Sequence, residues 1–252
     1  MRHHRPTDAQ KNAQKGNEHK QGGSSIENCL ILFVKSPEKG QVKSRLSQLI
    51  GENATRNLYK AFVADMLESI QYEPQYNIRI AFYPKNAKSN VIRWLGKQYS
   101  YLPQKGDGLG ERMAFTFGQI FSEGFKKALI IGSDIPDLPQ SIIIKAFESL
   151  STYDAVIGPS FDGGYYLIGF RNDTFSPEFF HGIEWGTDTV FSQTLDKFKK
   201  AQTVRIMPLW WDIDLPEDIK GLLERNKNTV FKNSRTISFL KKSRKISKFI
   251  KR

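Results

Sequence analysis

The stretch ALIIGSD, residues 128–134, places four apolar residues directly before a glycine, a serine and an aspartate. Such a short apolar run is typical of a strand buried on both faces of a sheet. Further strand-like runs and segments with helical spacing alternate on either side of it. The strand-like runs are 29–34, 78–82, 155–157, 165–170 and 204–207, and the helical segments are 55–70, 91–99, 109–125, 139–150, 187–198 and 216–225.

This alternation predicts β-α-β units. We therefore expect an α/β fold, a Rossmann-like three-layer sandwich with a mostly parallel central sheet. Sheets of this kind bind ligands at the carboxyl ends of their strands. Nearly all the unusual residues of this chain follow the end of a predicted strand, so we expect one functional site at that edge.

The net charge of +12 is concentrated at the two ends of the 252-residue chain. Residues 1–25 carry +3, residues 220–252 carry +11, and residues 26–219 carry −2. The nearly neutral middle argues against a nucleic-acid-binding face. We expect a disordered N-terminal arm over 1–25, one domain over 26–226 and a basic C-terminal tail over 227–252.

Cysteine and hydropathy indicate the compartment. The single cysteine, Cys29, allows no internal disulfide, which suits a reducing environment. No apolar run approaches the roughly 20 residues of a membrane span, and no apolar segment follows Met1 as in a secretory signal. We therefore expect a cytoplasmic protein.

Basic residues follow the first predicted strand. Lys35, Lys43 and Arg45 lie in one strand-to-helix loop, where cations and backbone N–H groups suit a di- or triphosphate. A solvated basic loop is the alternative, and the Walker pattern is absent. A second turn contains Gly110 and Arg112, a glycine that permits close approach and a cation that can reach a phosphate; a purely structural turn explains this pattern as well.

Carboxylates follow the later strands. Asp134 comes directly after the buried strand and is the better candidate for a ligand of Mg²⁺ or Mn²⁺. Asp137 is interpreted as a helix cap. Asp214 is a second candidate metal ligand, while Asp218 is expected to stabilise a helix start.

A glycine-rich turn supplies the last group of candidates. Asp162 is a candidate base or hydroxyl acceptor, although a plain hairpin explains the turn equally well. Gly163, Gly164 and Tyr165 fit a pocket floor. Trp185 suits stacking on a sugar or base, or core packing, and Thr187 is a candidate helix cap or pocket residue.

Together these segments resemble the nucleotide-diphospho-sugar transferase superfamily with the GT-A fold. Within it they are most similar to the rSAM/selenodomain-associated transferase 1 family of arsenosugar-biosynthesis-type glycosyltransferases. The matching strings are FVKSPEKGQVKSRL (33–46), QKGDGLGERM (104–113), IGSDIPDL (131–138), GPSFDGGYYLIG (158–169), WGTDTV (185–190) and DIDLPEDI (212–219). Leu215 replaces a threonine of the relatives, so one hydroxyl is lost.

The resemblance implies a divalent cation at Asp134 and nucleotide binding at Lys35, Lys43 and Arg45. It implies transfer of a sugar from a nucleotide-diphosphate donor to a small-molecule acceptor, with Asp162 as base if the reaction inverts. The Lys43–Leu46 segment also resembles phospholactate guanylyltransferases, so nucleotidyl transfer to a phosphorylated metabolite is the alternative. A non-catalytic nucleotide-binding module is the third reading.

The tail has an amphipathic pattern. Phe239, Ile246, Phe249 and Ile250 share one sector of a helical projection, and the opposite side is rich in Lys and Arg. A solvated disordered tail is the favoured interpretation, because four serines weaken helix formation. We also expect weak, salt-sensitive contact with anionic membranes, which such a helix could provide.

Overall fold

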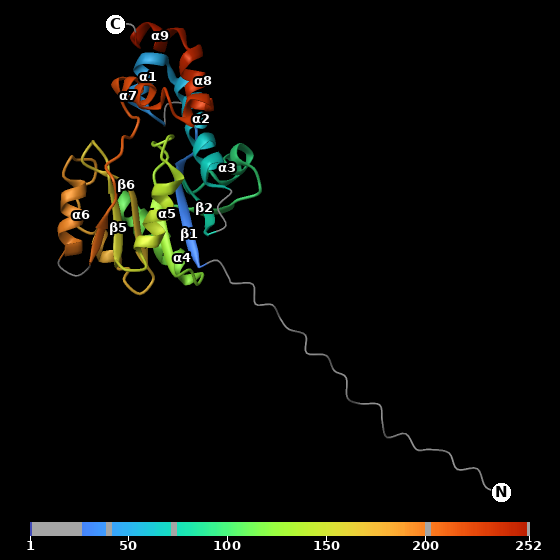
Figure 1. The fold of residues 1–252 in the computed structure, drawn as a ribbon, viewed down its shortest axis with the longest axis vertical. Helices are drawn as coiled ribbons and strands as arrows, with labels where there is room; N and C mark the ends of the chain where they lie inside the picture. The colour runs from blue at the N-terminus through green and yellow to red at the C-terminus, as the bar shows by residue number, and fades with distance from the viewer. Residues whose placement is uncertain (2–26, 39–41, 72–74, 200–202, 251–252) are drawn as a thin grey trace.

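The computed structural model describes residue 1 and residues 27–38, 42–71, 75–199 and 203–250 (Figure 1). The predicted disordered arm, apart from Met1, lies outside these residues. The described chain forms a three-layer α/β/α sandwich extended at one end by a group of helices.

The central sheet has seven strands among the described residues, in the order β3-β2-β1-β4-β6-β5-β7. All neighbouring pairs are parallel except those of β6, which runs antiparallel to β4 and β5. The predicted mostly parallel sheet is therefore confirmed. The strands are β1 (Asn28–Lys35), β2 (Asn77–Tyr83), β3 (Ser100–Pro103), β4 (Lys127–Ile131), β5 (Ala155–Pro159), β6 (Tyr165–Arg171) and β7 (Val204–Ile206).

Alternating residues of the strands face two helical layers. In β1, Leu30 and Leu32 pack into one core and Cys29 and Ile31 into the other. The first core is covered by α2 (Glu52–Ile70), α3 (Lys88–Leu95) and α5 (Gln140–Ser149). The second is covered by α4 (Leu109–Ser122), α6 (Val190–Lys199) and the 3₁₀ helix η1 (Pro177–Phe180).

A third apolar core lies beyond the carboxyl edge of the sheet, at the top of Figure 1. It joins the start of α2 to helices from both ends of the described chain. These are α1 (Ser44–Ile50), α7 (Pro216–Asn226), α8 (Arg235–Lys242) and α9 (Arg244–Ile250), with the 3₁₀ helix η2 (Val230–Asn233) between α7 and α8.

The expectation of a solvated C-terminal tail is wrong for the described residues. Ile237, Leu240 and Ile246 are almost fully buried in the third core. The carboxylate of Asp65 in α2 accepts hydrogen bonds from the backbone N–H groups of Arg235 (3.0 Å) and Thr236 (2.7 Å), and so satisfies the start of α8.

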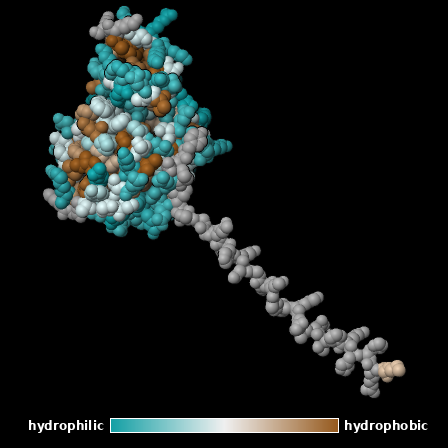
Figure 2. Space-filling model, in the orientation of Figure 1, coloured by the Kyte–Doolittle hydropathy of each residue, from teal (hydrophilic) through white to brown (hydrophobic). Residues whose placement is uncertain are grey.

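The apolar sector predicted to meet lipid therefore packs largely onto the domain, and contact with anionic membranes stays a prediction. Along the described part of the chain, no helix has both the length and the apolar character needed to cross a bilayer. Apolar side chains on the face seen in Figure 2 form separate patches within a mostly hydrophilic surface.

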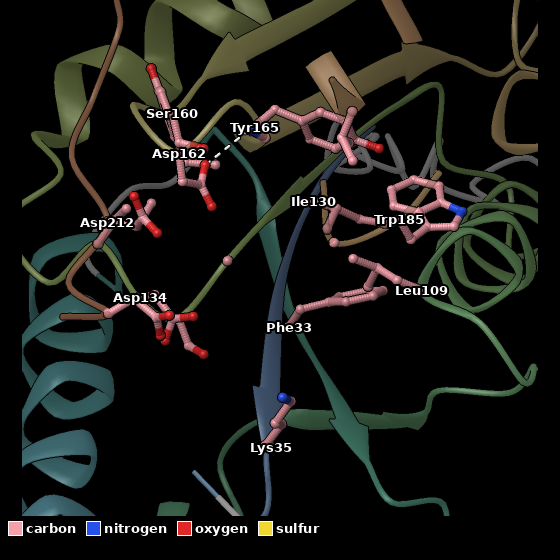
Figure 3. A pocket seen from close by; sticks show the side chains of 18 of the residues that line it. Phe33, Lys35, Leu109, Ile130, Asp134, Ser160, Asp162, Tyr165, Trp185 and Asp212 are labelled. Atoms are coloured by element: carbon pink, nitrogen blue, oxygen red, sulfur yellow. Dashed lines mark hydrogen bonds between the residues drawn. The ribbon is translucent and has the colours of Figure 1, made fainter. Parts of the chain in front are cut away.

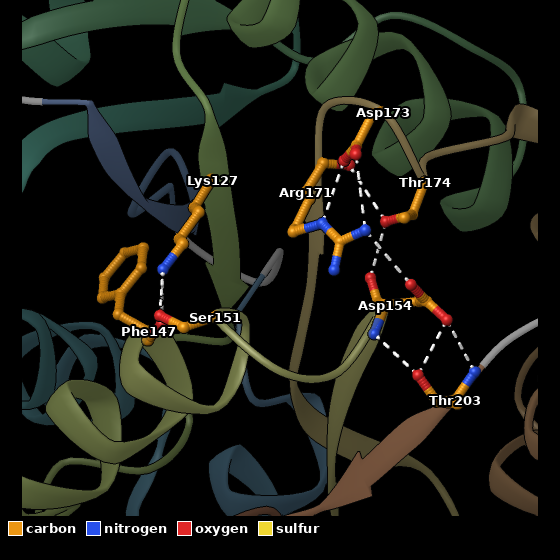
Figure 4. Close-up of polar contacts among 8 residues, drawn as sticks. All are labelled: Lys127, Phe147, Ser151, Asp154, Arg171, Asp173, Thr174 and Thr203. Atoms are coloured by element: carbon orange, nitrogen blue, oxygen red, sulfur yellow. Dashed lines mark hydrogen bonds and ion pairs between the residues drawn. The ribbon is translucent and has the colours of Figure 1, made fainter.

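Polar side chains join three strands at the edge of the sheet opposite the third core, where β5 and β7 begin and β6 ends (Figure 4). Asp154 accepts hydrogen bonds from the N–H (2.8 Å) and hydroxyl (2.7 Å) of Thr203 and pairs with Arg171 at 3.3 Å. The hydrogen bonds from Thr203, aided by the charge of Arg171, hold the pKa of Asp154 below its ordinary value. These contacts connect β5, β6 and β7 at this edge of the sheet.

Candidate functional site

A cavity of about 760 Å³ opens at the carboxyl edge of the sheet, where the sequence predicted it. Most of the candidate residues line it: Lys35, Lys43, Arg45, Arg112, Asp134, Asp162, Gly164, Tyr165, Trp185, Thr187 and Asp214. Gly110 and Gly163 are not among the lining residues, and their role is in the packing around it. Segments that are far apart in sequence are thus brought to one site.

The two sides of the cavity differ in chemistry (Figure 3). Asp134, Asp162 and Asp212 lie on one side, and aromatic and apolar side chains that include Tyr165 and Trp185 lie on the other. A site of this kind can hold a charged group at one end and a ring or apolar group at the other.

Lys43 lies at the centre of the acidic side. Its ammonium is 2.8 Å from Asp134 Oδ1 and 3.2 Å from Asp214 Oδ1, and its side chain is only 4% exposed. Arg45, which is 66% exposed, pairs with the other oxygen of Asp214 at 3.0 Å. Burial alone would lower the pKa of Lys43, but the two carboxylates hold it above its ordinary value.

The segment after β7 is held in place by its own backbone and by Asp218. The N–H of Ile213 donates to the carbonyl of Asp134 at 2.8 Å, which joins this segment to the end of β4. Asp218 Oδ2 accepts from the N–H groups of Asp214 (2.9 Å) and Leu215 (2.6 Å). The predicted structural role of Asp218 is confirmed, and through it the start of α7 positions Asp214.

Asp162 occupies the tip of the hairpin between β5 and β6. Its Oδ1 accepts hydrogen bonds from the hydroxyl of Ser160 and from the N–H of Gly164. These bonds fix one oxygen, while Oδ2 has no hydrogen-bond partner among the described residues. The turn is therefore a hairpin that places Asp162 in the cavity wall, and a role of Asp162 in catalysis stays a prediction.

Asp212 is a lining residue that the sequence analysis did not select. Its burial, together with the nearby charge of Asp162, raises its pKa to about 6. The alternation of Asp212 with Asp214 in an extended segment was the available signal. It predicts that both side chains point to the same side, which the shared cavity bears out.

Two glycines allow residues 185–190 to approach the sheet and α4. Gly163 has φ +87°, and a Cβ there would lie 2.1 Å from the carbonyl oxygen of Asp188. A Cβ on Gly110 would lie 2.6 Å from the indole of Trp185. Gly110, predicted to bind phosphate, thus lies against Trp185 and lets this side chain form the cavity wall.

Arg112 and Lys35 are the cations of the cavity for which no ion pair with a described carboxylate is present. The guanidinium of Arg112 lies 4.5 Å from the centre of the Tyr83 ring. Its Nε is buried without a hydrogen-bond partner among the described residues. Leaving a buried N–H donor without an acceptor costs free energy of folding. The Nε atom of Arg112 therefore favours an anionic or polar ligand beside Arg112.

Asp137 is not the helix cap that the sequence suggested. Its side chain is 1% exposed and accepts hydrogen bonds from Arg225 (2.6 and 3.0 Å) and Asn226 (2.6 Å). The residue before α5 is Pro139, and no side chain caps that helix. Asp137 therefore connects the loop after β4 to the end of α7.

The donor set suits a hard divalent cation. Asp134 and Asp214 each place an oxygen within 3.2 Å of one point, the Lys43 ammonium. Mg²⁺ is commonly held by one or two carboxylates together with substrate phosphates. No cluster of three or more His, Cys, Asp or Glu arranged for a metal occurs in the described ranges. A cation held by these two carboxylates would need further ligands.

Comparison with known proteins identifies relatives. The family described as an uncharacterized protein conserved in bacteria (DUF2064) matches residues 66–187. No curated protein matches the chain. A cytidylyltransferase from Leptospira borgpetersenii (TM-score 0.53, 13% identity, 90% of this chain and 97% of that one) shares the fold. A 4-diphosphocytidyl-2C-methyl-D-erythritol synthase from Anaerococcus prevotii also shares the fold (TM-score 0.53, 11% identity, 80% of this chain and 96% of that one).

A higher similarity extends over nearly the whole molecule. The crystal structure of a proposed nucleotide-diphospho-sugar transferase from Desulfovibrio desulfuricans G20 superposes with a TM-score of 0.86. The two sequences are 38% identical over 90% of this chain and 99% of that chain. The chain therefore belongs to the same family as the Desulfovibrio protein, within the nucleotide-diphospho-sugar transferase superfamily.

Proposed function

We propose that this protein is a metal-dependent glycosyltransferase that uses a nucleotide-diphosphate sugar and a small-molecule acceptor. One observation carries the proposal. Asp134, in the loop after β4, and Asp214, just before α7, converge beside a cavity that also contains cations free of described carboxylate partners. The assignment of the Desulfovibrio relative to the nucleotide-diphospho-sugar transferases supports it.

Asp134 and Asp214 would hold Mg²⁺ or Mn²⁺, and the cation would neutralise charge on the leaving diphosphate. Lys35 and Arg112 supply the positive charge that the carboxylates of the protein have not already neutralised. We therefore place phosphate recognition on these two residues, with Lys43 and Arg45 contributing once they are released from Asp214.

The acceptor would be activated at Asp162. In an inverting transfer, its free Oδ2 takes the proton of the acceptor hydroxyl while the hydroxyl oxygen attacks the anomeric carbon. The bond from that carbon to the diphosphate oxygen breaks, and the nucleoside diphosphate leaves. The hydrogen bonds from Ser160 and Gly164 hold the other oxygen and orient the carboxylate. Tyr165 and Trp185 offer ring faces suited to a sugar or acceptor ring.

Nucleotidyl transfer is the second candidate, and the position of Lys43 favours it. A buried ammonium beside the candidate metal ligands is suited to stabilising charge that develops at an α-phosphate. In that reaction the acceptor is a phosphorylated metabolite and pyrophosphate leaves. The narrower assignment to the rSAM/selenodomain-associated transferases belongs with the first candidate and stays a prediction.

A ligand screen followed by product analysis separates the candidates. Thermal stability is measured with nucleotide sugars and nucleoside triphosphates, each with and without Mn²⁺. Stabilisation by a nucleotide sugar and release of a nucleoside diphosphate support glycosyl transfer. Stabilisation by triphosphates alone, with pyrophosphate exchange, selects nucleotidyl transfer, and absence of metal-dependent stabilisation by any nucleotide contradicts both.

A further inference from the structure

The ammonium of Lys43 occupies the point where the two candidate metal ligands meet. It contacts an oxygen of Asp134 and one of Asp214, and its side chain is 4% exposed. A metal cation bound to these same two oxygens would have to displace the ammonium.

The backbone directs Lys43 to this position. It has φ 51° and ψ 49°, in the left-handed region that residues with a Cβ rarely adopt. It is the residue immediately before α1, and its carbonyl accepts a hydrogen bond from the N–H of Ser47 at 3.0 Å. Lys43 is the one described residue other than glycine with a positive φ, so the local fold holds the side chain toward the carboxylates at a conformational cost.

An ammonium and a divalent cation cannot share these oxygens without strong repulsion. Two like charges about 3–4 Å apart repel strongly at the effective dielectric of a protein site. Removing Lys43 from both carboxylates without a substitute partner is also unfavourable, because a buried charge would lose its partners. The negative charge of Asp134 and Asp214 is therefore neutralised either by the Lys43 ammonium or by a divalent cation, and the two exclude each other.

We infer that Lys43 is an internal counter-cation that competes with the metal for Asp134 and Asp214. Metal entry then requires Lys43 to move to another anion, and a nucleotide phosphate supplies it. Metal and nucleotide consequently bind with positive coupling, and the free enzyme has low affinity for the metal alone. This inference rests on the proposed function and adds to it the order in which the site is assembled.

The test measures Mn²⁺ binding to the full chain without nucleotide, by electron paramagnetic resonance of free Mn²⁺. Wild type should bind weakly, and Lys43→Met should bind at least about tenfold more tightly because the competing charge is gone. The matched control is Arg45→Met, which removes an exposed cation that pairs with Asp214 but not with Asp134. The Mn²⁺ affinity of this variant should differ from that of wild type by less than about threefold. Adding Asp134→Asn to Lys43→Met should abolish the gain.

A second measurement uses the wild-type protein and does not depend on a variant's folding. An amine-reactive acetylating reagent is applied with and without Mn²⁺ plus nucleotide, and modification of Lys43 is quantified by mass spectrometry relative to Lys35. In the free protein Lys43 should be protected, because its side chain is 4% exposed. Acetylation of Lys43 to the same extent as Lys35, in the absence of metal and nucleotide, would contradict its placement between the two carboxylates.

The outcomes separate this inference from the proposed function. Equal Mn²⁺ affinity of wild type and Lys43→Met, with tight binding once a nucleotide sugar is added, overturns the competition and leaves the function standing. Failure of all forms to bind Mn²⁺ with any nucleotide overturns both.

Discussion

Asp137 and Arg225, which are 88 residues apart in sequence, form a bidentate ion pair with Nε–Oδ2 and Nη2–Oδ1 distances of 2.6 and 3.0 Å. The pair joins the loop after β4, which carries Asp134, to the end of α7. Because the start of α7 positions Asp214, this ion pair connects the supports of both candidate metal ligands.

Asp137→Ala should lower the free energy of unfolding by about 3–5 kcal/mol, because it leaves a largely buried guanidinium without its partner. Chemical denaturation at pH 7 measures the effect. The control is Lys227→Ala, which breaks an exposed pair with Glu224 and should cost less than about 1 kcal/mol. Equal small losses in the two variants would show that the Asp137 pair does not hold the two segments together.

The C-terminal helices should contribute to global stability. Leu240→Ala removes a side chain that is 1% exposed and should cost about 2–5 kcal/mol. Ser238→Ala, at an exposed position of the same helix, should change stability by no more than about 0.5 kcal/mol. A Leu240→Ala variant with the unfolding midpoint of wild type would indicate that this segment is solvated after all.

Much of the fold could be predicted because the apolar runs are local signals. The strand prediction for 29–34 and the helix prediction for 55–70 differ from β1 and α2 by no more than three residues at either end. The four-residue strand β3 was missed, because it is too short to show a period. Helix α8 was not the favoured interpretation, because its buried residues pack in the third core, mainly against α2, and no local pattern contains such contacts.

The candidate site was predictable to the extent that it follows strand ends. Asp134 lies in the loop after β4, and Asp162 lies in the turn between β5 and β6. Their positions in the cavity follow from the strand order of the sheet. The pairing of Lys43 with Asp214 joins residues 171 positions apart and could not be predicted from spacing. The role of Asp137 depends on Arg225 in the same way, and local sequence alone indicated a cap.

Gly163→Ala should destabilise the wall of the cavity more than a comparable glycine substitution. Gly163 and Gly186 share a φ of +87°, but a Cβ would meet the carbonyl of Asp188 only at Gly163. Gly186→Ala should cost about 1–2 kcal/mol for the left-handed backbone alone. Gly163→Ala should cost about 1–3 kcal/mol more.

Both variants are compared by thermal unfolding and by affinity for a nucleotide sugar. Weaker binding is expected for Gly163→Ala, because residues 185–190 must shift to admit the methyl group. Identical stability and affinity in the two variants would mean that this close approach does not shape the cavity.

The ionisation of Asp212 should give stability a defined pH dependence. Its folded-state pKa of about 6 lies above the ordinary value of 3.8, so its contribution to stability is complete below about pH 4 and is lost as pH rises through about 6. Stability of Asp212→Asn relative to wild type should therefore increase by about 1–2 kcal/mol between pH 4 and 7, after allowance for solvent screening.

Asp154→Asn provides the control of opposite sign. The pKa of Asp154 is lowered by its hydrogen bonds with Thr203, so its contribution is present at neutral pH and is lost as pH falls. Denaturation curves of both variants from about pH 2 to 8 give the two slopes, because the contribution of Asp154 is lost only below its unfolded pKa of 3.8. A flat difference between Asp212→Asn and wild type would contradict the half-buried environment of Asp212 beside Asp162.

The most direct measurement of the central claim is calorimetric titration of the wild-type protein and Asp134→Asn with a nucleotide sugar, in Mn²⁺ and in a chelator. Wild type should bind in Mn²⁺ and lose at least about tenfold in affinity in the chelator. Asp134→Asn should show the weak affinity in both conditions while still unfolding in one cooperative transition, at a midpoint lowered by the loss of one carboxylate partner of Lys43. Binding that is equally tight in the chelator, or equally tight in Asp134→Asn with Mn²⁺, would contradict a metal-assisted nucleotide-sugar site at Asp134.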